Sequence, residues 1–247
     1  MTRTDTAWQN AELAQTFLEG VRGGIPLAAE QINLILKIIN LALPKVETFL
    51  DLGCGDGVLG RAILAKYPTA KGVFLDFSET MLAAAKSKLG NNQNAEFISQ
   101  DFGVKDWVKA VKNQGEFDLI VSGFAIHHQT DERKKEIYQE IFSLLKPGGL
   151  FLNLEHILSP SQWIETAFSE VFIDSLYEFH QRNQSGKSRE EIAQEFYHRP
   201  DKVANILAPL EVQCDWLKEI GFINVDCYFK VLEIALFGGM KATQLSI

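Results

Sequence analysis

Hydrophobic and polar positions follow two periods along the first 156 residues of the chain. Short apolar runs, typical of buried strands, recur at residues 46–50, 72–76, 96–101, 117–122 and 150–154. Between most of these runs, apolar residues recur at the three- and four-residue spacing of one helix face. Because strands alternate with helices, the pattern predicts a mostly parallel sheet covered by helices on both faces.

Residues at the ends of these helices suit helix caps. Pro26 suits a first helical position, and the helix that follows it is expected to end at Pro44. Ser78 is expected to cap a helix over residues 79–89, which ends at Gly90.

The alternation stops after His156. Residues 157–208 are expected to be helical and rich in aromatic side chains, and residues 210–220 form one more predicted helix. Two β-rich stretches follow, at 223–229 and 231–237. Because so little chain separates them, they can pair only as an antiparallel hairpin.

These elements predict an α/β protein with a Rossmann-like, mostly parallel sheet of seven strands that ends in an antiparallel hairpin. We expect four segments along the chain. Residues 1–44 form an N-terminal helical cap, 45–156 a cofactor-binding core and 157–208 a helical lid insertion. Residues 209–247 complete the core with a helix and the hairpin.

Net charge argues against nucleic acid as a partner. The chain carries a formal net charge of −8, whereas proteins that bind a phosphate backbone usually present a basic stripe. The densest basic run, Arg133-Lys134-Lys135, has acidic neighbours on both sides and is expected to be a solvated helix face.

Cysteine spacing and hydropathy bear on the compartment. Cys54, Cys214 and Cys227 show no paired spacing, which predicts neither a disulfide framework nor a zinc site. The N-terminus has no apolar signal-peptide core, and the longest apolar stretch, residues 26–43, contains five polar side chains. We therefore expect a cytoplasmic protein without a membrane span; the oligomeric state stays open.

A glycine-rich turn connects the first predicted strand to the helix after it. It reads Asp51-Leu52-Gly53-Cys54-Gly55-Asp56-Gly57, and Asp76 ends the second strand 25 residues after Asp51. Glycines let the backbone approach a ligand closely. An acid at the end of the second strand can accept hydrogen bonds from both hydroxyls of a ribose. The carboxyl ends of these strands are therefore predicted to bind a nucleoside-containing cofactor.

This turn resembles the Asp/Glu-x-Gly-x-Gly-x-Gly motif of the class I S-adenosylmethionine-dependent methyltransferase family. The resemblance covers roughly residues 45–156 and, more loosely, the terminal hairpin. It implies that S-adenosylmethionine is the cofactor and that Asp51 accepts from its ammonium group. Adenine would lie against Phe77, with Asp101 accepting from its amino group. The residues that the resemblance assigns to the cofactor are Asp51, Gly53, Gly55, Gly57, Asp76, Phe77, Asp101, Phe102, Ser122 and Gly123.

Two other functions fit parts of the same pattern. Residues 55–60 also satisfy the Gly-x-Gly-x-x-Gly pattern of nicotinamide dinucleotide binding, so an NAD-dependent oxidoreductase is an alternative. Asp51, Asp101 and the run Lys146-Pro147-Gly148-Gly149 before the fifth strand favour S-adenosylmethionine instead. A non-catalytic scaffold that binds S-adenosylmethionine is the other alternative, against which the intact motif and Asp76 argue.

Histidines follow two of the predicted strands. His127 and His128 lie just past the fourth strand and His156 just past the fifth, and an imidazole can remove a proton from an acceptor near neutral pH. Alternatively, the adjacent pair lines the cofactor pocket. We expect no metal site here, because adjacent side chains point apart and no third ligand appears at suitable spacing.

The predicted helical insertion would cover an acceptor of small or medium size. Most of Trp163, Phe168, Phe172 and Tyr177 recur at nearly helical spacing and are expected to pack in the core. Residues with polar or charged groups that could hold the acceptor are Arg22, Tyr177, His180, Tyr197, His198 and Arg199.

The expected reaction is O- or N-methylation of that acceptor by in-line displacement. The alternative within the same fold is an enzyme like the carboxy-S-adenosylmethionine synthases, which modify the bound cofactor itself. That chemistry needs a positive residue near the methyl group, for which Arg22 and Arg199 are candidates.

Overall fold

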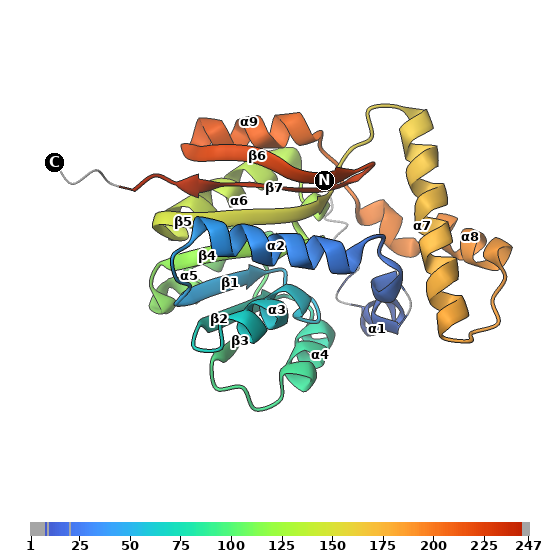
Figure 1. Ribbon diagram of the computed structural model, residues 1–247, viewed down its shortest axis with the longest axis horizontal. Coiled ribbons are helices and arrows are strands. Elements are labelled where there is room, and N and C mark those ends of the chain that lie inside the picture. The colour runs from blue at the N-terminus through green and yellow to red at the C-terminus, as the bar shows by residue number, and fades with distance from the viewer. Residues whose placement is uncertain (1–7, 9, 20, 244–247) are drawn as a thin grey trace.

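The computed structural model describes residues 8, 10–19 and 21–243 of the 247-residue chain. Its centre is a seven-stranded sheet with the strand order β3-β2-β1-β4-β5-β7-β6 (Figure 1). Strands β1 to β5 are parallel, whereas β7 is antiparallel to both β5 and β6. The strands are β1 (Thr48–Leu52), β2 (Lys71–Asp76), β3 (Ala95–Ser99), β4 (Phe117–Gly123), β5 (Leu145–His156), β6 (Phe222–Val231) and β7 (Ile234–Lys241). The predicted sheet and its terminal hairpin are confirmed.

Helices cover both faces of the sheet. Apolar side chains of α2, α3 and α7 share one buried cluster, and those of α5, α6 and α9 share the other. The helices are α1 (Ala11–Glu19), α2 (Ala28–Ala42), α3 (Val58–Lys66), α4 (Glu79–Leu89), α5 (Trp107–Val111), α6 (Asp131–Leu144), α7 (Gln162–Arg182), α8 (Arg189–Tyr197) and α9 (Leu210–Ile220). Short 3-10 turns are η2 (Val21–Gly24), η3 (Lys112–Gln114), η4 (Ile126–His128) and η5 (Pro200–Ala204). Among the described residues, no helix is long and apolar enough to cross a membrane.

Side chains along β5 alternate between the two faces. Leu152 and Leu154 belong to the cluster with α2 and α7, while Phe151 belongs to the cluster with α6 and α9. Because successive residues of a strand point to opposite faces, Glu155 shares the face of Phe151 and His156 shares the face of Leu154. Two neighbouring polar residues at the end of β5 therefore lie on different sides of the sheet.

Several predicted boundaries coincide with the structure. The helix predicted over 79–89 is α4 and ends at Gly90, and the helix predicted over 210–220 is α9. The expected start of the last strand at Val231 is wrong, because β6 continues through that residue and the chain turns after it. Helix α5 was not predicted, since its five residues are too few to show a helical period.

The insertion after β5 consists of α7, α8 and η5, and the N-terminal turn η2 packs against α7 (Figure 1). Gly23 and Gly24 make this contact possible. A Cβ on Gly23 would overlap the Phe179 ring, and a Cβ on Gly24 would overlap the Leu176 side chain. The glycines that interrupt helix formation near the N-terminus thus let this segment approach the insertion closely.

One expectation about exposure is wrong. Arg133 and Lys134, expected on a solvated face, are 9% and 0% exposed. The Arg133 guanidinium donates to the carbonyl of Phe102 at 2.8 Å, and the Lys134 ammonium donates to the carbonyl of Ile206. These cations bind loop carbonyls that are distant in sequence, so local charge patterning could not reveal them. Of the four aromatic residues of which most were expected in the core, Phe168 and Phe172 are buried and Tyr177 packs against them, while Trp163, in the first turn of α7, is 73% exposed.

Candidate functional site

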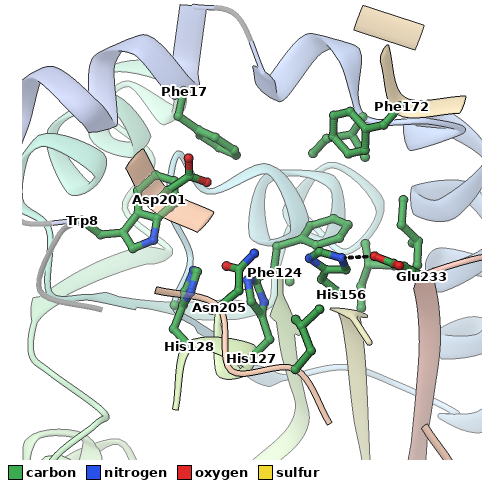
Figure 2. Close-up of a pocket in the computed structure, with 18 of the residues that line it drawn as sticks. Trp8, Phe17, Phe124, His127, His128, His156, Phe172, Asp201, Asn205 and Glu233 are labelled. Carbon is green, nitrogen blue, oxygen red and sulfur yellow. Dashed lines mark hydrogen bonds and ion pairs between the residues drawn. The ribbon is translucent and has the colours of Figure 1, made fainter. Parts of the chain in front are cut away.

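A cavity of about 850 Å³ lies where the carboxyl ends of the parallel strands meet the helical insertion. This volume is typical of small-molecule sites. The turns after β1, β2, β4 and β5 line one side, and α7, α8 and η5 line the other, with Trp8 and Phe17 at the N-terminal edge (Figure 2). The strand order reverses between β1 and β4, which is where open α/β sheets bind ligands.

The glycine turn after β1 forms one wall of the cavity. Gly53 and Gly55 line it with φ angles of 66° and 54°, a backbone region that residues with a Cβ rarely adopt. A Cβ on Gly53 would also overlap the side chain of Ala125. Gly57 is not among the lining residues; it precedes α3 with φ 75° and packs near Phe74. Its role is to let α3 start close to β2.

Two buried carboxylates face this wall. Asp51 is 1% exposed, lines the cavity and accepts a hydrogen bond from the Gly60 N–H at 2.8 Å. The two oxygens of Asp76 accept from the N–H groups of Gly55 and Ser78, each at 2.8 Å. Burial raises the pKa of Asp76, and these backbone hydrogen bonds oppose the rise. Since a carboxylate oxygen has two acceptor sites, Asp76 is held rigidly while keeping capacity for a ligand.

The remaining residues predicted to bind cofactor divide into two groups. Phe77, Phe102 and Gly123 line the cavity. Asp101 and Ser122 are not among the lining residues: Asp101 accepts from the Gly103 N–H at 2.7 Å, and the Ser122 hydroxyl donates to the Leu52 carbonyl at 2.8 Å. Both side chains thus make contacts that fix the loop after β3 and the pairing of β4 with β1.

His127 and His128 lie in η4, directly after β4, and both line the cavity. Their ring centroids are 3.9 Å apart, so the expectation that the adjacent side chains point apart is wrong. The tight 3-10 turn brings both rings to the same side. The Nδ1 of His128 lies 3.1 Å from the carbonyl of Ala204, and the N–H of Ile206 donates to the His127 carbonyl at 3.0 Å. These bonds attach the end of the insertion to the end of β4.

A buried carboxylate holds His127. Its Nδ1 lies 2.6 Å from an oxygen of Glu155, which is 1% exposed. Burial raises the pKa of Glu155 to about 7 and lowers the pKa of His127 well below its ordinary value. The side chain of Asn205 also hydrogen-bonds the His127 ring and lies beside it in Figure 2. His127 is therefore neutral at neutral pH and fixed from two sides.

His156 forms a second pair with a carboxylate. Its Nε2 lies 2.6 Å from an oxygen of Glu233, which sits in the turn between β6 and β7 (Figure 2). The other oxygen of Glu233 accepts from the Ser159 hydroxyl at 2.5 Å. The His156 ring lies 5.2 Å from the Phe168 ring, and 5.8 Å from the His127 ring, between centroids.

The insertion adds charge to the cavity. The Arg199 guanidinium lies 5.0 Å from the Phe196 ring centroid and 5.9 Å from that of Phe172, and its Nε is 3.4 Å from Asp201. Burial lowers the pKa of Arg199. Burial and the neighbouring Arg199 lower the pKa of Lys202 as well. These charges face the cavity from the side opposite the glycine turn.

Of the six residues predicted to hold the acceptor, the structure places Arg199 in the cavity wall. The side chain of Arg22 lies outside the described residues. The other four are not among the lining residues and make contacts within the insertion or beside it: Tyr177, His180, Tyr197 and His198.

Sequence reasoning missed Glu155, Glu233 and Asn205. Each of the two acids follows or interrupts an apolar run, Leu-Phe-Leu-Asn-Leu-Glu and Val-Leu-Glu-Ile. A lone acid in a buried strand needs a partner, which was the available signal. Asn205 carries no such signal, since it lies in a loop.

This chain is similar to a family model over part of its length and to individual proteins over part or nearly all of it. A family model described as "Methyltransferase domain" matches residues 49–149. Malonyl-[acyl-carrier protein] O-methyltransferase 2 of Ilyobacter polytropus is 35% identical over 108 residues, which are 44% of this chain and 39% of that protein. Carboxy-S-adenosyl-L-methionine synthase of Nautilia profundicola is 25% identical over 238 residues, which are 93% of this chain and 92% of that protein.

Solved structures share the fold at low identity. An O-methyltransferase family protein from Burkholderia thailandensis superposes with a TM-score of 0.58 and 16% identity, over 87% of this chain and 58% of the other. Human N-acetylserotonin methyltransferase, in complex with S-adenosylmethionine, gives a TM-score of 0.56 and 17% identity, over 86% of this chain and 52% of the other.

The sheet order, the glycine turn and the terminal hairpin define a Rossmann-like methyltransferase fold. Residues 49–149 match a methyltransferase domain, and the fold is that of class I S-adenosylmethionine-dependent methyltransferases, whose cofactor is S-adenosylmethionine. The residues present fit this cofactor, because Gly55 lines the cavity with open space where a Cβ would stand and Asp76 retains acceptor sites for a ribose. The match of residues 49–149 to a methyltransferase domain disfavours the nicotinamide alternative.

Proposed function

We propose that the chain transfers the methyl group of S-adenosylmethionine to a hydroxyl or amine of a small acceptor. The observation that carries this proposal is that one cavity joins the glycine turn and Asp76 to three histidines and the aromatic wall of the insertion. S-adenosylmethionine supplies an electrophilic methyl group. Holding an acceptor in line with it, away from water, supplies much of the rate acceleration.

The two sides of the cavity have separate tasks in this proposal. Asp51 binds the ammonium group of the cofactor, and Asp76 binds its ribose. Phe77 and Phe102 pack against adenine. On the other side, the rings of the insertion hold the acceptor and exclude water, and a neutral histidine takes up the proton that the acceptor loses.

The cavity, the net charge and the cysteines support a small-molecule acceptor and a reducing compartment for this function. A cavity of about 850 Å³ suits a small-molecule acceptor, and a net charge of −8 disfavours nucleic acid. Three free thiols, those of Cys54, Cys214 and Cys227, fit a reducing compartment such as the cytoplasm.

Thermal unfolding with S-adenosylmethionine, S-adenosylhomocysteine, NAD and NADP tests the cofactor. A ligand at a hundred times its dissociation constant stabilises by about 2.7 kcal/mol, so the first two should raise Tm and the others should not. Release of S-adenosylhomocysteine in the presence of phenol, catechol, 4-hydroxybenzoate or tyramine then tests transfer. Stabilisation by NAD alone would overturn the proposal, and cofactor binding without release would favour the scaffold alternative.

A second function has a specific observation in its favour. The relatives that match nearly the whole chain, from Nautilia profundicola and Campylobacter lari, are carboxy-S-adenosylmethionine synthases at 25% and 26% identity. An enzyme of that kind needs a cation near the methyl group, and Arg199 lines the cavity. Mass spectrometry of the nucleotide released from purified protein separates the two functions. A mass 44 units above that of S-adenosylmethionine would favour the synthase, since roughly that mass is added by a carboxyl group replacing hydrogen.

A further inference from the structure

His127 and His156 line the same cavity, each is paired with a buried carboxylate, and the two carboxylates have different partners: Glu233 also lines the cavity, whereas Glu155 lies behind its wall. Glu155 accepts from the backbone N–H groups of Ile126, His127 and His156, at 2.8, 3.2 and 3.1 Å. These bonds hold the start of η4 against the end of β5. Glu155 therefore has a structural task that is independent of the His127 ring.

Glu233 has no comparable task. Among the described residues, its carboxylate oxygens have hydrogen bonds only with two side chains, those of His156 and Ser159. Glu233 is nevertheless 4% exposed, and burying a carboxylate is costly unless its partners compensate. An acid buried at this cost, with one oxygen on an imidazole and the other on a hydroxyl, is arranged to orient the imidazole.

The two histidines also differ in what remains available on the ring. Glu155 and Asn205 both hydrogen-bond His127, as described above. His156 uses Nε2 for Glu233, and within the described part of the chain its Nδ1 has no hydrogen-bond partner. Its side chain is 18% exposed, against 8% for His127.

The position of His156 suits contact with the acceptor. The alternation along β5 puts it on the cavity side, beside Leu154, and the Phe168 ring from the insertion packs near it. Phe124 and Phe172 lie around it in Figure 2. His156 thus stands where the sheet, the hairpin turn and the aromatic wall of the insertion meet.

We propose that His156 is the catalytic base of the proposed methyl transfer, with Glu233 as the residue that positions it; this inference rests on the proposed function. The Nδ1 of His156 takes the proton of an acceptor hydroxyl as the O–H bond breaks. The oxygen then forms the new O–C bond, and the C–S bond breaks with its electron pair left on sulfur. Glu233 keeps the proton of His156 on Nε2 and balances the positive charge that develops on the ring. His127 is a positioning residue that holds η4.

Histidine NMR tests the tautomers without any acceptor. In ¹⁵N-histidine-labelled full-length protein saturated with S-adenosylhomocysteine at pH 8, His156 is expected to be protonated on Nε2 with a bare Nδ1. His127 is expected in the opposite tautomer. The His156→Gln and His127→Gln variants assign the signals. Glu233→Ala should abolish the fixed Nε2–H tautomer of His156, and Glu233→Asp should keep it. A wild-type His156 protonated on Nδ1 would overturn the proposal.

Turnover tests the role itself, with whichever of phenol, catechol and 4-hydroxybenzoate the wild-type protein methylates. His156→Gln is expected to lower kcat at least a hundredfold, typical of a lost general base, with S-adenosylmethionine affinity within twofold of wild type. Glu233→Gln should lower kcat about tenfold and Glu233→Asp should recover part of it. The matched control, Glu219→Gln, changes an exposed acid paired with Lys135 and should leave kcat unchanged.

A wrong assignment of His156 and a wrong proposed function would give different results. If His156→Gln turns over as fast as wild type, the base assignment is overturned while methyl transfer stands. If the wild-type protein methylates none of the three compounds, the proposed function loses support and the NMR tautomers still decide the arrangement of His156.

Discussion

One side of the cavity is made largely of backbone, and the other side is made of side chains. Around the glycine turn, N–H groups and positive-φ glycines shape the wall, and Asp76 is fixed by two backbone bonds. Across from it, Phe172, Arg199 and Glu233 come from three separate segments. A wall of backbone tolerates few changes, so it recognises one cofactor. A wall of side chains can change residue by residue, which is how related folds serve different acceptors.

The largest expected effect concerns Glu155, the buried carboxylate that holds His127 in the cavity wall. Its pKa is raised from 4.5 to about 7, so its contribution to stability is full below pH 4.5 and is lost as pH rises through 7. We therefore expect the free energy of unfolding of the wild type, measured by chemical denaturation, to fall relative to that of Glu155→Gln by roughly 3 kcal/mol between pH 4.5 and 7. Because His127 contacts Glu155 directly, the difference reports the titration of the Glu155–His127 pair. Parallel pH curves would show that the carboxyl is charged throughout.

The backbone side should depend on Asp76. Asp76→Ala removes a charge-assisted acceptor for the ribose, worth roughly 1.5–3 kcal/mol, and should weaken S-adenosylmethionine binding at least about tenfold by calorimetry. Asp106→Ala, at an exposed ion pair with Lys109, is the matched control and should bind normally. Unchanged affinity in Asp76→Ala would mean that other residues hold the ribose.

Gly24 lets the N-terminal turn η2 pack against α7, one of the helices of the side-chain wall, and this packing should contribute to stability. Gly24→Ala places a methyl group against Leu176 of α7 and should lower the free energy of unfolding by about 1–2 kcal/mol. Gly90→Ala is a useful comparison, because its Cβ meets nothing within 4 Å and only its φ of 59° is strained. An unchanged free energy of unfolding in Gly24→Ala would show that the contact between η2 and α7 adds nothing.

The smallest effect is expected at Arg199, where the two proposed functions diverge. Arg199→Gln should leave S-adenosylmethionine affinity within twofold. It should reduce the preference for 4-hydroxybenzoate over phenol by roughly fivefold, which corresponds to about 1 kcal/mol for the loss of one charge contact. An unchanged ratio would show that Arg199 holds no carboxylate of the acceptor.

The backbone side was predictable from sequence and much of the other side was not. A glycine turn and strand-end acids such as Asp76 are local signals, because their chemistry depends on a few consecutive residues at the end of a strand. The pairs His127–Glu155 and His156–Glu233 join residues 28 and 77 positions apart. No local period encodes such contacts. The prediction that Lys134 is exposed to solvent was wrong for the same reason, because its partner, the Ile206 carbonyl, is distant in sequence.

The antiparallel hairpin at the end of the chain has a consequence for the order in which the site forms. Synthesis releases the glycine turn well before Glu233, which lies 176 residues after Gly57. Domains begin to fold while the rest of the chain is still being made. A nascent chain can thus complete its cofactor turn before it has the acid that orients His156. During synthesis, the ability to bind the methyl donor would precede the ability to use it.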